Sequence, residues 1–296
     1  MKKNKKTFFR TYSLVIILSL SHYGFLWSQE IVKETFTYKD TLQLDFYSII
    51  EKINPERPLI VIVHGGGFSK GKRDGSKIVK FANYFVAQGY AVASISYHLT
   101  RRGTSFGCDC SDDDKVKTFV DVAQNIADAV LFLQNKSNEF EFDIDKTILM
   151  GSSAGAEGVL NLVFMKDDYR FSHIPKFPVA GIISLAGAVL DKEYITDSTK
   201  VPVMFFHGVK DKLVPYETAS HHFCNSDTDG YLILDGSEAM AKRLELLNTS
   251  YILAFSTEGG HEWATLGYKY TDLIKCFIEQ VIILKLFLQT KIQLKK

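Results

Sequence analysis

The chain has 296 residues, of which 46% are hydrophobic and 23% are charged. This composition excludes a disordered or fibrous protein and suits one large domain around a single core. The formal net charge is +1, but five basic and no acidic residues lie among the first 28, so the remainder carries −4. That balance excludes an overall electrostatic attraction to nucleic acid or to an anionic membrane.

The first 28 residues have the three parts of a secretory signal. MKKNKK is basic, Leu14–Leu20 and Phe25–Trp27 are apolar, and Ser28 is a small residue suited to the position before a cleavage site. The alternative is an uncleaved anchor, but the apolar stretch is interrupted and shorter than the roughly 20 residues of a spanning helix. We therefore expect a signal peptide at 1–28, a mature domain at 29–296, and a secreted or periplasmic protein without stable membrane insertion.

The mature chain opens on EIVKETFTYKD and LQLDFYSI, whose period of two predicts an antiparallel hairpin. Apolar runs then predict buried strands that alternate with helices. The expected strands are 58–63, 90–95, 147–150, 179–185, 201–206 and 250–255, and the expected helices are 78–88, 116–135, 154–165, 213–223, 237–247 and a long closing helix at 263–288. This alternation predicts an α/β fold with a mostly parallel central sheet, helices on both faces and no separate cap domain. Functional side chains of such sheets gather at the carboxyl ends of the strands.

A candidate nucleophile follows the strand at 147–150. GSSAG at 151–155 fits G-x-S-x-G and stands between a strand and a helix, which is the context that gives this pattern its meaning. The chain must reverse there within one or two residues, and glycines on either side leave room for neighbouring backbone. The pattern indicates Ser153 as nucleophile, with Ser152 as a rival outside the central position.

A glycine-rich turn follows the strand at 58–63. In HGGGF at 64–68, glycine lets the backbone itself approach a substrate, and its N–H groups can stabilise the oxyanion of acyl transfer. We expect Gly66, Gly67 and the amide of Ala154 to be the donors. His64 is interpreted as a structural hydrogen-bonding residue and not as a base.

A candidate acid and a candidate base follow the last two central strands. HGVKDKLVP at 207–215 places Asp211 after one strand, and GGHEW at 259–263 places His261 after the other. A carboxylate can orient a histidine, which then takes the proton of a serine hydroxyl. Four other aspartates compete for this role, but none directly follows a central strand with this spacing: Asp191, Asp227, Asp229 and Asp235.

No spacing indicates a metal site, and the expected chemistry needs no cofactor. Adjacent residues on a helix point apart, so His221 and His222 within the expected helix at 213–223 are interpreted as surface residues. The four cysteines of an exported chain permit disulfides, and a bridge from Cys108 or Cys110 to Cys224 is our expectation.

In combination and in this order, HGGGF, GSSAG, HGVKDKLVP and GGHEW resemble the esterase/lipase branch of the α/β-hydrolase superfamily. The nearest groups are the hormone-sensitive-lipase-like and feruloyl-esterase-like carboxylesterases, and the resemblance spans about residues 35–288. It implies the α/β-hydrolase fold and a serine hydrolase with the triad Ser153, Asp211 and His261. It implies nothing specific about the acyl or alcohol group of the substrate.

The chain departs from the resembled pattern in two places. Many relatives have a tyrosine–arginine pair where this chain has Tyr97-His98, and many have glycine after the G-x-S-x-G motif where this chain has Ala156-Glu157. Both departures concern the pocket lining. The polar stretch 103–114 forms either a pocket rim or a solvated loop, and an open site would suit acylated polysaccharide as well as short-chain esters.

Two other functions compete with ester cleavage. A secreted serine peptidase uses the same triad, although this chain has no large added domain. A non-catalytic binding protein on a hydrolase fold usually lacks one triad member, and all three are present here.

Overall fold

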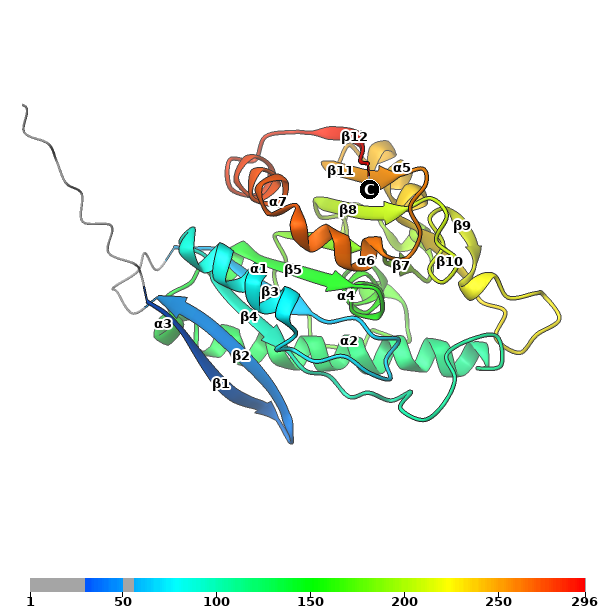
Figure 1. Cartoon of the computed structure of the whole chain (residues 1–296), viewed down its shortest axis with the longest axis horizontal. Coiled ribbons are helices and arrows are strands. Elements are labelled where there is room, and N and C mark those ends of the chain that lie inside the picture. The colour runs from blue at the N-terminus through cyan, green and yellow to red at the C-terminus, as the bar shows by residue number, and fades with distance from the viewer. Residues whose placement is uncertain (1–29, 50–55, 296) are drawn as a thin grey trace, which may run out of the picture.

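The computed structural model describes residues 30–49 and 56–295, so the predicted signal peptide lies outside the described residues. A nine-stranded sheet in the order β1-β2-β4-β3-β5-β6-β8-β11-β12 forms its centre (Figure 1). The strands are β1 Ile31–Lys39, β2 Leu42–Ile49, β3 Leu59–Val63, β4 Ala91–Ile95, β5 Thr147–Ser152, β6 Gly181–Leu185, β8 Val203–Gly208, β11 Tyr251–Ser256 and β12 Gln289–Gln293. The β1/β2 and β2/β4 pairs are antiparallel, and the other pairs of this sheet are parallel.

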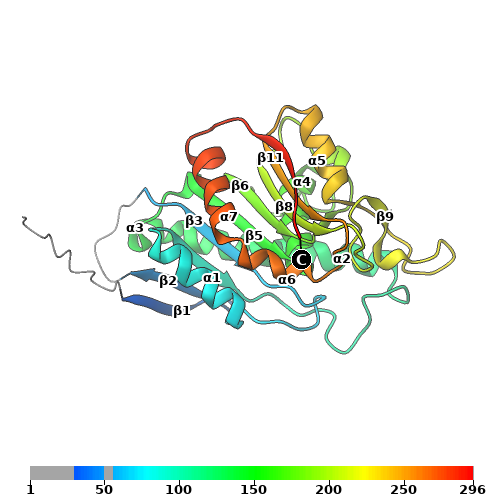
Figure 2. The same ribbon diagram turned by 45° about the horizontal axis from the view of Figure 1, so that its top comes forward.

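The helices cover both faces of the sheet. They are α1 Ser76–Ala87, α2 Asp112–Asn135, α3 Ser137–Phe140, α4 Ala154–Phe164, α5 Ser237–Leu246, α6 Trp263–Leu266 and α7 Thr271–Phe277. Figure 2 shows α1, α6 and α7 across the near face of the sheet. A small antiparallel sheet, β7 Ala188–Val189, β10 Ile233–Gly236 and β9 Thr218–Ser220, lies beside α4 and α5.

Alternation along the central strands divides the core into two layers. In β3, Leu59, Val61 and Val63 belong to the cluster that contains α2, α4 and α5, whereas Ile60 and Ile62 belong to the cluster that contains α1, α6 and α7. The sequence of a strand that is buried on both faces is a continuous apolar run, and LIVIV is such a run. The predicted α/β architecture with helices on both faces is therefore confirmed.

Two predicted helices are wrong. The segment 213–223 is no helix: it contains β9 and a single 3₁₀ turn at His221–Phe223, and φ is 58° at His222 and 54° at Phe223, which no α-helix tolerates. The closing helix predicted at 263–288 is broken into α6, a 3₁₀ turn at Gly267–Lys269, α7 and a π-helical turn at Ile278–Ile283.

The break near Gly267 has a packing cause. A Cβ atom at Gly267 would lie 2.5 Å from a methyl group of Leu185, so the helix approaches β6 closely there. After the π-helical turn, Lys285 has a φ of 56°, and the chain turns back to add β12 as an edge strand beside β11. Val281 and Ile282 pack on the sheet, whereas Leu284, Leu286 and Phe287 are exposed. Among the described residues, no helix combines the length and the apolar character needed to cross a membrane.

Candidate active site

Ser153 occupies the sharp turn between β5 and α4. Its φ of 50° and ψ of −123° lie in a region that non-glycine residues rarely adopt. The glycines of the motif are required by contact: a Cβ at Gly151 would lie 2.4 Å from the Cα of Ala156, and a Cβ at Gly155 would lie 2.3 Å from the carbonyl oxygen of Val63. The turn therefore holds Ser153 at the carboxyl end of the sheet and at the amino end of α4.

The three predicted catalytic side chains come together at this edge. The Oγ of Ser153 lies 2.8 Å from Nε2 of His261, and Nδ1 of His261 lies 2.7 Å from Oδ2 of Asp211. Asp211 follows β8 and His261 follows β11, and these two strands are parallel neighbours. Since a carboxylate only accepts, Nδ1 of His261 donates to Asp211, and Nε2 is left to accept the serine proton.

Asp211 is buried and held by several donors. Its Oδ1 accepts the backbone N–H groups of Leu213 at 2.8 Å and Val214 at 3.1 Å. Burial alone would raise the pKa of Asp211, but hydrogen bonds from His207 and His261 outweigh burial and lower the pKa below its ordinary value. The carboxylate is thus ionised at neutral pH, as a partner for a charged imidazole must be.

Sequence reasoning did not identify His207. Its Nε2 lies 3.4 Å from Oδ2 of Asp211 and 3.2 Å from the carbonyl oxygen of Val214, and its Nδ1 lies 2.7 Å from Oγ of Ser237. A carbonyl only accepts, so the Nε2 atom carries the proton. His207 therefore helps to hold the carboxylate of Asp211. The sequence signal that could have identified it is its position as the penultimate residue of β8.

Two of the predicted oxyanion donors, Gly66 and Gly67, line the same cavity as Ser153, and the third, Ala154, directly follows Ser153. Gly66 and Gly67 have φ values of 125° and 59°, and Ala154 is the first residue of α4. Within residues 30–49 and 56–295, no acceptor takes the N–H of Gly66, Gly67 or Ala154. The amino end of α4 adds a partial positive charge beside Ser153, which favours a developing negative oxygen.

His64 holds the glycine loop in place. Its ring stacks on Tyr97 at 4.4 Å, its Nδ1 lies 2.8 Å from the carbonyl oxygen of Gly65, and the hydroxyl of Tyr97 donates to the carbonyl of His64 at 2.9 Å. Burial lowers the pKa of His64. This placement fits the predicted structural role, and it shows what Tyr97 does beside His98, where this chain departs from the resembled pattern.

A cleft of about 920 Å³ opens above the triad. It is lined by Ser153, His261 and the 65–67 glycines, and Thr104 and Phe106 of the 103–114 segment form part of its wall. This segment is therefore a pocket rim. The bridge predicted from Cys108 or Cys110 to Cys224 is confirmed with Cys108 as the partner, and it ties this rim to the 213–236 segment.

The inner wall of the cleft contains residues that the sequence did not identify as site residues. Glu157 and His221 are 2% and 1% exposed, and both line the cleft together with His222. The prediction of a surface position is wrong for His221, which is buried, whereas His222 is partly exposed at the wall of the cleft, because the segment 213–223 lies along the cleft instead of forming a solvated helix.

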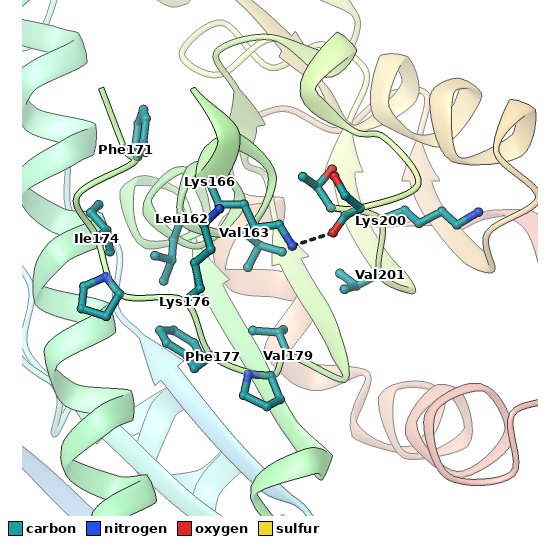
Figure 3. A pocket seen from close by; sticks show the side chains of 14 residues that line it. Leu162, Val163, Lys166, Phe171, Ile174, Lys176, Phe177, Val179, Lys200 and Val201 are labelled. Carbon is teal, nitrogen blue, oxygen red and sulfur yellow. Dashed lines mark hydrogen bonds between the residues drawn. The ribbon is translucent and has the colours of Figure 1, made fainter. Parts of the chain in front are cut away.

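A second cavity, of about 200 Å³, lies near the amino ends of the central strands β6 and β8 (Figure 3). Its walls include Val179 and Val201, which precede β6 and β8. Lys166 reaches across it and donates to the carbonyl oxygen of Ser198 at 2.6 Å. Ser153 and His261 do not line this cavity, whereas both line the larger cleft. In the described part of the chain, no group of three or more His, Cys, Asp or Glu side chains is arranged to hold a metal ion.

The fold and these motifs define the class: the chain has the α/β-hydrolase fold with a hydrogen-bonded serine, histidine and aspartate. Residues 44–177 match the family model BD-FAE. A search of curated proteins found no similar sequence.

Solved structures share the fold at low sequence identity. MGS-M1, an α/β hydrolase enzyme from a Medee basin deep-sea metagenome library, is 16% identical over 86% of this chain and 99% of its own, with a TM-score of 0.58. Est2, a thermophilic esterase from Thermogutta terrifontis with butyrate bound, is 17% identical over 84% of this chain and 94% of its own, with a TM-score of 0.60. Esterase B from Lactobacillus rhamnosis is 15% identical over 86% of this chain and 87% of its own, with a TM-score of 0.54. The resemblance that the four motifs predicted is thus confirmed at the level of the fold.

Proposed function

We propose that this chain is a serine carboxylic ester hydrolase that acts through an acyl-enzyme intermediate. The observation that carries the proposal is the continuous hydrogen-bonded series from Ser153 through His261 to the buried Asp211 at the floor of an open cleft. The family match over residues 44–177 and the esterases among the structural neighbours support the same activity.

Each step follows from the geometry. Ser153 attacks the ester carbonyl while Nε2 of His261 takes its proton, and Asp211 stabilises the imidazolium that forms. The N–H groups of Gly66, Gly67 and Ala154 receive the oxyanion, each donor contributing roughly 3 kcal/mol to the transition state. His261 then protonates the departing alcohol, and water attacks the acyl-enzyme with His261 again as base.

The substrates that we propose are short-chain esters or acyl groups carried on polysaccharide. The described residues include no cap domain over the cleft, and the 103–114 rim leaves it open to a large alcohol portion. The signal-like segment 1–28 supports export to the periplasm or the exterior. Shortening the 103–114 rim should change the ranking of substrates, and an unchanged ranking would contradict this assignment of the rim.

The test is hydrolysis of 4-nitrophenyl esters from acetate to octanoate by the purified protein, beside Ser153→Ala. Turnover that disappears in the variant is expected, and the chain-length profile then measures the acyl pocket. If the folded protein cleaves no ester, the proposal is contradicted. A fluorophosphonate would in that case separate a serine peptidase, whose Ser153 is labelled, from a non-catalytic binding protein, whose Ser153 is not.

A further inference from the structure

The side chain of Glu157 enters the cleft one helical turn after the nucleophile. Residues four apart on a helix lie on the same face, and α4 carries Glu157 four positions beyond Ser153. The side chain is almost completely buried, and its Oε1 has no hydrogen-bond partner among the described residues. Nearly all buried polar atoms in folded proteins have a partner, so this atom requires an explanation.

A second unpartnered polar atom lies beside it. His221 is equally buried, its Nε2 is 3.4 Å from Oε1 of Glu157, and its Nδ1 has no partner in the described part of the chain. The two side chains approach each other without forming a hydrogen bond. The ring of Phe106 stands edge-on to His221 at 5.1 Å and lines the same part of the cleft.

The surroundings favour the uncharged form of both side chains. Burial, together with the nearby charge of Asp211, raises the pKa of Glu157 to about 8 although Lys115 opposes the shift, and burial lowers the pKa of His221 well below its ordinary value. A carboxylic acid both donates and accepts a hydrogen bond, and so does a neutral imidazole. An uncharged group that also donates and accepts a hydrogen bond would therefore match this pair.

We propose that Glu157 and His221 form a polar subsite that binds a hydroxyl group of the ester substrate. The inference rests on the proposed ester hydrolysis and makes it more specific: the preferred substrate carries a hydroxyl group near the scissile bond. The hydroxyl belongs either to the acyl group or to the alcohol, because both portions of an ester lie against Ser153 during the reaction. The departure from the resembled pattern at Ala156-Glu157 is then the feature that selects the substrate.

Two matched pairs of esters test the subsite. The acyl pair is 4-nitrophenyl 3-hydroxybutanoate and 4-nitrophenyl butanoate, and the alcohol pair is 3-hydroxybutyl acetate and butyl acetate, followed by acid release. The measured quantity is the ratio of kcat/KM within each pair. We expect the wild-type ratio to favour the hydroxylated member of one pair about 10- to 100-fold, the range for one hydrogen bond to a group that is otherwise buried without a partner.

Variants at the two positions identify the residues responsible. Glu157→Met, similar in volume but without a donor or acceptor, should bring that ratio close to one, and Glu157→Gln should retain part of it. His221→Phe should lower the same ratio, and it provides an independent test if Glu157→Met does not fold. The control is Glu139→Met on α3, at the opposite end of the molecule (Figure 1), which should leave the ratio unchanged.

The outcomes separate the two proposals. Wild-type ratios near one in both pairs, with ester cleavage still dependent on Ser153, would overturn the subsite and leave the hydrolase proposal standing. A ratio that Glu157→Met and His221→Phe both preserve would also overturn it. A folded wild-type protein that cleaves none of the four esters would overturn both proposals.

Discussion

Replacing Glu157 with glutamine should change how the stability of the protein depends on pH. In the unfolded chain this carboxyl has its ordinary pKa of 4.5, and in the folded protein burial raises the pKa to about 8. Folding above pH 4.5 therefore requires the carboxyl to bind a proton. The contribution of this carboxyl to the free energy of unfolding is therefore at its maximum below pH 4.5. It decreases as the pH rises and is lost as the pH passes 8.

The size of the effect follows from the width of this interval. One pKa unit corresponds to 1.36 kcal/mol, so the wild-type free energy of unfolding should decrease relative to that of Glu157→Gln by about 1.4 kcal/mol per pH unit. Between pH 5 and pH 8 the difference should amount to about 3.5 kcal/mol, because the slope is smaller close to each of the two pKa values. The cost of burying the glutamine amide in the variant does not depend on pH. It therefore does not affect how the difference between the two proteins changes with pH.

The assay is urea unfolding of both proteins, with the disulfide intact, at one-unit steps from pH 5 to pH 8. His221 touches Glu157 and titrates below its ordinary value, so the steps above pH 6.5 give the cleanest slope. Glu139→Gln is the control, because that side chain is 59% exposed. A wild-type-minus-variant difference that stays constant within about 0.5 kcal/mol would refute the reasoning, since the group would then be hydrated or ionised in the folded protein.

Three further predictions concern the triad and its supports. Asp211→Asn should lower kcat for 4-nitrophenyl acetate by about 10⁴-fold with the melting temperature little changed, because an amide does not fix the histidine tautomer; a loss below tenfold would contradict the assigned role. Separating Cys108 from Cys224 by substituting both with alanine should lower the free energy of unfolding by about 2–5 kcal/mol, since the bridge spans 116 residues. Chemical denaturation measures this, and a reduced wild type should behave like the variant. Gly155→Ala should destabilise the protein by about 1–3 kcal/mol or more and abolish ester cleavage, because its methyl group would lie 2.3 Å from the carbonyl oxygen of Val63; wild-type activity in a stable variant would refute the steric argument.

The parts of the fold that the sequence predicted are those fixed by local pattern. An apolar run such as LIVIV at Leu59–Val63 is typical of a buried strand in a parallel sheet. The glycine motif at 151–155, between a strand and a helix, predicts a sharp turn. Because parallel strands end at one edge, the meeting of Ser153, Asp211 and His261 followed from their positions after three strands.

The errors come from segments whose structure depends on distant contacts. The helix predicted at 213–223 is displaced by the pairing of β9 with β10 and by the hydrogen bonds of the Asp211 carboxylate to the backbone of Leu213 and Val214. The closing helix is broken where Gly267 meets Leu185, a contact about eighty residues away along the chain. His221 was predicted to lie on the surface of the expected helix at 213–223, and its neighbours in space, Glu157 and Phe106, are too distant in sequence to have indicated otherwise.

Asp211 and Glu157 thus differ in protonation state, and their surroundings explain the difference. Asp211 receives two backbone N–H groups and two histidines, so it stays ionised despite burial, whereas Glu157 receives no donor at Oε1 and stays protonated. The charge of Asp211 is itself one cause of the raised pKa of Glu157. Environments that push two pKa values apart in one site assign different tasks to the two groups. The ionised carboxylate serves the histidine, and the neutral acid is left with a free polar atom for the substrate.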